Sequence, residues 1–97
     1  MVNPFSPHRG ANIVASPTSA SAEVSVATNA YTVRFVNSGS NICYVVCGES
    51  PVVATTADTP VLPSTSLVLS KSARDNAVAH ISSSGTTLNI QCGNGGL

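Results

Sequence analysis

Charged side chains are scarce in this chain of 97 residues, and they balance one another. Asp, Glu, Lys and Arg make up 8 % of the residues, four acidic and four basic, so the formal net charge is zero. Typical domains carry about 25 % charged residues. Four basic side chains cannot neutralise the roughly six or more phosphates of a usual nucleic-acid footprint. The charge count therefore argues against nucleic acid as a partner.

Aromatic residues and long apolar runs are also lacking. Tryptophan is absent and aromatic residues make up 4 % of the chain, too few for a base-stacking surface. The longest charge-free run, Asn76–Leu97, is rich in polar residues and predicts no membrane span. Met1–Gly10 holds two prolines and no apolar signal-peptide core follows it, which predicts a protein that stays in the cytoplasm.

What the chain has instead is hydroxyl groups and valine. The sequence contains 15 serines, 9 threonines and 13 valines. Valine and threonine are β-branched and fit a pleated sheet. A surface of hydroxyl groups without net charge has little electrostatic protection against association. The composition therefore indicates either a surface that partner proteins cover or a tolerated low-charge monomer.

Short alternating segments between turn residues predict an all-β fold. Tyr31–Cys47 has the pattern of a hairpin around the turn Asn37–Ser40. No segment keeps a helical period over ten residues. About seven to eight short antiparallel strands at this spacing predict one small β-sandwich or jelly-roll-like barrel. Seven strands are expected over 23–27, 31–37, 41–47, 52–54, 66–70, 77–82 and 86–92. A short strand over 13–15 would be the eighth, and 61–62 is expected to be an edge or a corner because Pro63 follows it.

The first 22 residues differ from the rest. Two prolines favour extended backbone near the start, and residues 15–22 are small and mostly polar. This predicts an extended N-terminal arm over 1–22 and a sandwich domain over 23–97, with a disordered terminus as the alternative. An arm that docks on a partner protein would use Phe5 as its anchor. The predicted partner-binding residues are Pro4, Phe5, Pro7, His8 and Arg9.

The three cysteines, Cys43, Cys47 and Cys92, fit more than one reading. Cys43 and Cys47 share a strand face, but four extended residues separate them by about 13 Å. That exceeds the ~7 Å between Cα atoms that a disulfide allows, and it prevents shared zinc ligation. Cys92 could meet either one across strands, which leaves an odd thiol. The sequence favours three reduced cysteines that pack as small hydrophobic residues, and no metal site.

No catalytic arrangement is visible. The sequence lacks a Gly-x-Ser-x-Gly elbow and an obvious carboxylate pair, and its glycine-rich end has no following helix to bind phosphate. His80 is expected to be a hydrogen-bonded structural histidine on a strand face. We therefore expect no enzyme activity and no cofactor.

Two charged positions lead to further expectations. Arg34 is expected to pair with Glu49 or Asp58, or to reach a partner. Residues 71–76 hold three of the eight charged residues, which predicts an exposed turn or one helical turn.

A combination of short motifs gives a resemblance to a known class of proteins. The chain contains Val36-Asn37-Ser38-Gly39, Thr56–Pro60, Ser84–Leu88 and a glycine-rich end from Gly93. Together these resemble small β-sandwich virion proteins of tailed bacteriophages, of the capsid decoration or cement type, over about residues 31–96. The chain departs from that pattern at Pro63-Ser64, where a glycine turn is expected.

The resemblance implies a structural virion protein that binds the outer surface of a phage capsid and stabilises the head. Its implied partners are the major capsid protein and further copies of itself, as a dimer or trimer. Its implied location is the virion, after assembly in the host cytoplasm. The alternatives are a head fibre, neck or tail accessory protein, and a carbohydrate-binding adhesin module. An adhesin needs exposed aromatic rings, whereas alternation places Tyr31 and Tyr44 inward.

Overall fold

The structure is a computed structural model that describes residues 4–7 and 12–96. These residues form nine β-strands and no helix. The strands are short, with two to seven residues each. Their bounds are β1 Ser6–Pro7, β2 Ile13–Ala15, β3 Ala22–Ser25, β4 Thr32–Asn37, β5 Cys43–Gly48, β6 Thr59–Val61, β7 Thr65–Ser70, β8 Ala77–Ile81 and β9 Leu88–Asn94.

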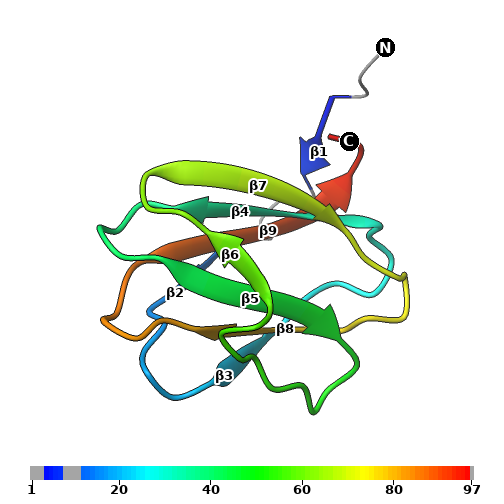
Figure 1. Ribbon diagram of the computed structural model, residues 1–97. Coiled ribbons are helices and arrows are strands. Elements are labelled where there is room, and N and C mark those ends of the chain that lie inside the picture. The colour runs from blue at the N-terminus through cyan, green and yellow to red at the C-terminus, as the bar shows by residue number, and fades with distance from the viewer. Residues whose placement is uncertain (1–3, 8–11, 97) are drawn as a thin grey trace.

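The strands build two antiparallel sheets that face each other (Figure 1). Sheet A has the order β1-β9-β4-β7, and β2 pairs with β9 on the same edge as β1. Sheet B has the order β3-β8-β5-β6. The predicted all-β sandwich is therefore confirmed. The two-residue strand β1 brings the observed number of strands above the seven or eight expected.

The core lies between the two sheets because alternate side chains of each strand point inward. Val33 and Phe35 of β4 and Leu88 and Ile90 of β9 are completely buried. Val45 of β5 faces them from sheet B and is also buried. This burial explains why these strands alternate so clearly in the sequence. By contrast, residues 52–54, expected to be a weak strand, form no strand.

The predicted hairpin of residues 31–47 is wrong. β4 pairs with β7 and β9, whereas β5 pairs with β6 and β8 in the other sheet. Asn37 ends β4, and its side-chain amide donates to the carbonyl oxygens of Asn41 at 2.8 Å and of Val61 in β6 at 3.0 Å. These bonds guide residues 38–42 across the sandwich from one sheet to the other. Sequence alternation alone cannot distinguish such a crossing from a hairpin turn.

The first strands belong to the edge of sheet A. Both β1 and β2 pair with β9, and Ala15 and Pro17 are buried. The pairing of β1 with the end of β9 places residues 6–7 beside residues 93–94 (Figure 1). The division of the chain into an arm over 1–22 and a domain over 23–97 stays a prediction.

Candidate functional site

A groove of about 650 Å³ opens between the sheets on the side where β6 and β7 are the edge strands. Val45 and Leu69 give it apolar walls, and Cys47 lines it from β5. Asp58 and Lys71 place charges along it. The groove thus makes part of the core reachable from outside the sandwich. Sequence patterns did not predict this groove, because its walls come from three separate segments, 45–47, 57–60 and 69–75.

The turn after β7 lines part of this groove with Lys71, Ser72 and Asp75. Lys71 is only 8 % exposed, and its ammonium donates to the carbonyl oxygens of Ser72 at 3.2 Å and Asp75 at 2.9 Å. Its backbone N–H donates to the carbonyl of Tyr31 at 2.9 Å. The predicted exposed turn over 71–76 is therefore wrong at Lys71. Carbonyl oxygens of the turn accept hydrogen bonds from the ammonium in place of water molecules.

All three cysteines are free thiols, as the sequence favoured. Cys43 and Cys92 are sealed in the core, while Cys47 is half-buried beside the groove. Burial raises the pKa of the Cys43 and Cys47 thiols to about 11 each. The negative charge of Asp75 raises the pKa of Cys47 further. At neutral pH these thiols stay protonated, and a protonated thiol is a poor nucleophile.

His80 lies in β8, where its register partners are Val45 and Ala22. The residue is 4 % exposed, and its Nδ1 atom has no hydrogen-bond partner among the described residues. The expectation of a hydrogen-bonded histidine is therefore wrong for this nitrogen. Desolvation by burial lowers the pKa of the imidazole, so His80 is held neutral at pH 7.

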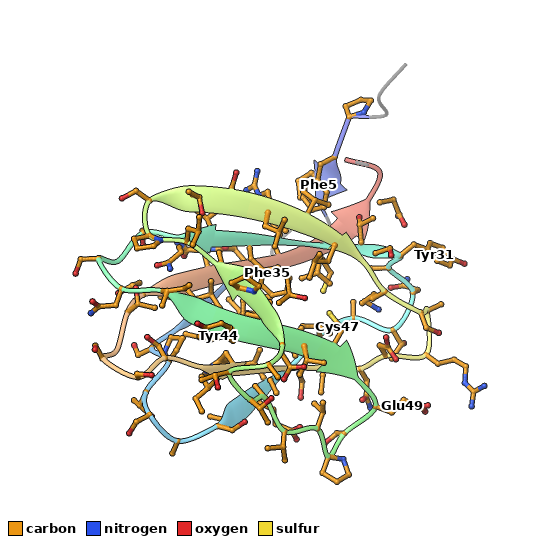
Figure 2. The ribbon with its side chains drawn as sticks, viewed as in Figure 1. Phe5, Tyr31, Phe35, Tyr44, Cys47 and Glu49 are labelled. Atoms are coloured by element: carbon orange, nitrogen blue, oxygen red, sulfur yellow. The ribbon has the colours of Figure 1, made fainter. Side chains whose placement is uncertain are left out.

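The N-terminal segment lies on its own chain. Ser6 and Pro7 pair with Asn94 and Gly93 of β9. The Phe5 ring lies 5.4 Å from the guanidinium carbon of Arg34, on the outer face of sheet A (Figure 2). This distance fits a cation–π contact.

Of the predicted partner-binding residues, Pro4 and Pro7 are exposed and Phe5 is half-buried. His8 and Arg9 lie outside the described residues. The binding role of these five residues stays a prediction.

The expected pairing of Arg34 with Glu49 or Asp58 is wrong. Its guanidinium donates to Gln91 Oε1 at 3.4 Å and lies beside Phe5 instead. Arg34 points to the outer face of sheet A, whereas Glu49 and Asp58 follow and precede strands of sheet B.

Tyr31 also differs from its expected inward position. It is 61 % exposed, and Figure 2 shows its side chain pointing away from the sandwich. The reason is that β4 begins at Thr32, so the inward phase of Val33 and Phe35 does not extend back to Tyr31.

The described residues contain no group of three or more His, Cys, Asp or Glu side chains that could hold a metal ion. They also contain no helix long and apolar enough to cross a membrane.

The fold and these features define a small two-sheet β-sandwich with jelly-roll strand order. The sequence matches no protein-family model and no curated protein. The fold is similar to that of a solved structure of Bacillus endospore appendages, which are described as a novel family of disulfide-linked pili. The TM-score is 0.57 with 15 % sequence identity, over 84 % of this chain and 77 % of that chain. At this identity the similarity shows a shared fold.

This finding overturns the resemblance to virion proteins of tailed phages. The solved structure that shares the fold comes from a pilus and not from a phage particle. The predicted capsid decoration function, its fibre, neck, tail and adhesin alternatives, and the virion location are therefore wrong. The major capsid protein has no support as a partner.

The motifs behind that resemblance have a structural explanation. Asn37 Oδ1 accepts hydrogen bonds from the Gly39 backbone at 3.1 Å and from Thr86 Oγ1 at 2.7 Å. A Cβ atom at Gly39 would collide with the Thr86 side chain. The motif at residues 36–39 and the motif at residues 84–88 are therefore in contact with each other. Motifs that serve the fold recur in proteins of different function, so they do not identify one.

Proposed function

We propose that this chain is a structural subunit of a filament on a bacterial cell or spore surface, assembled from copies of itself. The fold similarity to a Bacillus endospore appendage supports a pilus-type role rather than a catalytic one. The observation that carries the proposal is the unprotected edge of sheet A at β7. The low charge of the chain agrees with a surface that neighbouring copies cover.

The edge strand β7 has six residues and pairs with β4 alone among the described strands. It contains no charged residue and no proline, the two features that usually protect an edge strand from pairing with another chain. The neighbouring edge strand β6 has only three residues and contains Pro60. β7 therefore offers a free row of backbone donors and acceptors to a second copy.

The second free edge lies on the other side of the sandwich. β3 (Ala22–Ser25) pairs with β8 alone in sheet B. Its one charged side chain, Glu23, already accepts hydrogen bonds from Ser50 Oγ and the Val52 backbone N–H of the same chain. If the sheet A edge of one copy pairs with the sheet B edge of the next copy, the contact joins two different surfaces of the subunit. Repetition of such a contact produces an open chain of subunits unless the rotation closes a ring. β7 of one copy pairing with β3 of the next therefore builds a filament.

The test uses the purified full-length chain in a dilution series, followed by light scattering and negative-stain electron microscopy. We expect filaments above a threshold concentration. Ser66→Lys with Ser70→Lys places two cations on β7, and Ser83→Lys places one on an exposed turn as the matched control. A loss of ~1.4 kcal/mol per contact raises the threshold about tenfold. We expect this shift for the β7 variant and none for the control.

Two results count against the proposal. A chain that stays monomeric at every concentration, with a native circular dichroism spectrum, is not a filament subunit. Filaments that form equally well from the β7 variant show that another surface joins the copies.

A further inference from the structure

We propose that Cys47 and Cys92 form a disulfide within one chain that links the two sheets across the core, and that Cys43 stays a free thiol. The two cysteines come from facing sheets, Cys47 from β5 in sheet B and Cys92 from β9 in sheet A. This inference does not depend on the proposed function. The disulfide would join two cysteines of the same chain and not cysteines of two neighbouring chains.

The register of the strands places the two thiols at the same end of the sandwich. Cys92, Val33 and Leu69 form one row across β9, β4 and β7 of sheet A. Cys47 and Leu69 line the same groove, so Cys47 faces this row from the opposite sheet. In Figure 2 Cys47 points from β5 into the space between the sheets. Both cysteines belong to the same packed cluster of apolar side chains.

The two thiols are also close enough to interact electrostatically, since a negative charge on Cys92 raises the pKa of Cys47. Cys43 has different surroundings. It is completely buried, and its sulfur accepts from the Asn37 amide at 3.9 Å near the other end of β5. Cys43 is therefore the matched control within the same chain.

The proposed disulfide requires the strand ends that carry Cys47 and Cys92 to move toward each other. Facing sheets lie about 10 Å apart, whereas a disulfide needs Cα atoms within about 7 Å. Glycine follows each cysteine directly, as Gly48 and Gly93. Glycine adapts its backbone at low cost, so the strand ends can approach each other.

The groove supplies access for an oxidant, here a small-molecule disulfide such as oxidised glutathione. The Cys47 thiol loses its proton, and its sulfur attacks one sulfur of the small disulfide. A mixed disulfide forms and one small thiolate leaves. Cys92 then loses its proton and attacks the Cys47 sulfur, which forms the Cys47–Cys92 bond and releases the second thiolate. The two protons convert the thiolates to thiols, so two protein thiols are oxidised and one small disulfide is reduced.

The test incubates the reduced full-length chain with oxidised glutathione, then denatures it, blocks thiols with N-ethylmaleimide and digests it with trypsin without reduction. Cleavage after Arg34, Lys71 and Arg74 separates the peptide 35–71 from the peptide 75–97. We expect these two peptides joined by a disulfide, with the maleimide on Cys43. We also expect the bridge to form about tenfold faster per pH unit between pH 8 and 10, because the pKa of Cys47 is about 11.

Three variants assign the roles. Cys43→Ala forms the bridge as the unmodified chain does. Cys92→Ala stops at the mixed disulfide and accumulates glutathione on Cys47, whereas Cys47→Ala leaves Cys92 unmodified because the core seals it. Circular dichroism checks that each variant is folded. If a variant does not fold, the peptide analysis of the unmodified chain decides the result. Three maleimide labels on the unmodified chain, a bridge to Cys43, or a disulfide-linked dimer on a non-reducing gel would overturn the proposal.

Discussion

At the residue scale, Asn37 shows how one buried polar side chain holds the fold. It is completely buried, and its amide group donates to two carbonyl oxygens and accepts two hydrogen bonds. Its partners lie in the loop after β4, in β6 of sheet B and in the turn before β9. A buried amide is stable in a core only because all of its hydrogen-bonding groups are used.

Replacing Asn37 therefore leaves the buried carbonyl oxygen of Val61 and three part-buried partners without these hydrogen bonds. We expect Asn37→Ala to lower the free energy of unfolding by about 2–4 kcal/mol, since each unsatisfied buried group costs roughly 1–3 kcal/mol. Urea unfolding followed by circular dichroism measures this difference. Asn29→Ala, at an exposed turn position, is the control and should change stability by less than about 0.5 kcal/mol. Equal effects of the two substitutions would refute this role for Asn37.

His80 makes stability depend on pH. Burial lowers its pKa in the folded chain below the unfolded value of about 6.5. The unfolded chain therefore binds the proton more readily, so stability is complete above pH 6.5 and falls as the pH decreases below it. We expect a lower melting temperature at pH 5 than at pH 7.5, and a smaller difference in His80→Gln. The same pH difference in the variant and the unmodified chain would assign the effect to other groups.

At the scale of single elements, the N-terminal strand β1 is held by very few contacts. It has two register pairs with β9, and the Phe5 ring beside it lies against Arg34. We expect Phe5→Ala to lower the free energy of unfolding by about 0.5–1 kcal/mol, the usual worth of an exposed cation–π contact. Thermal unfolding measures this, with Pro4→Ala at an exposed position as the control. No difference between the two variants would show that the Phe5–Arg34 contact adds nothing.

Elements also differ in how well the sequence predicts them. β4, β8 and β9 alternate or are rich in buried apolar residues, and the sequence placed each within about two residues of its observed bounds. The pairing partners of a strand were harder to predict than its first and last residues, as β4 and β5 show. Both strands are central in their own sheets, so each has an apolar pattern that fits pairing with the other. Only the bonds of Asn37 and the register decide that the chain crosses between sheets.

At the scale of the whole molecule, the near absence of charge determines how copies would meet. The net charge is zero and the edge strand β7 has no charge. Contacts made by backbone hydrogen bonds and apolar side chains are screened very little by salt. We therefore expect the threshold concentration for filament formation to change less than about twofold between 0.05 and 1 M sodium chloride. A light-scattering titration measures it, and dissociation at high salt would indicate electrostatic contacts instead.

The sequence by itself determined the class of fold. Strand-forming alternation, short spacing between turns and the scarcity of charge are local or summed properties, so they can be read without coordinates. The groove beside β7, the buried ammonium of Lys71 and the facing thiols of Cys47 and Cys92 were decided by the tertiary structure alone. Each of them joins segments that are far apart in the chain, and sequence patterns report the face of a strand but not which strand lies opposite.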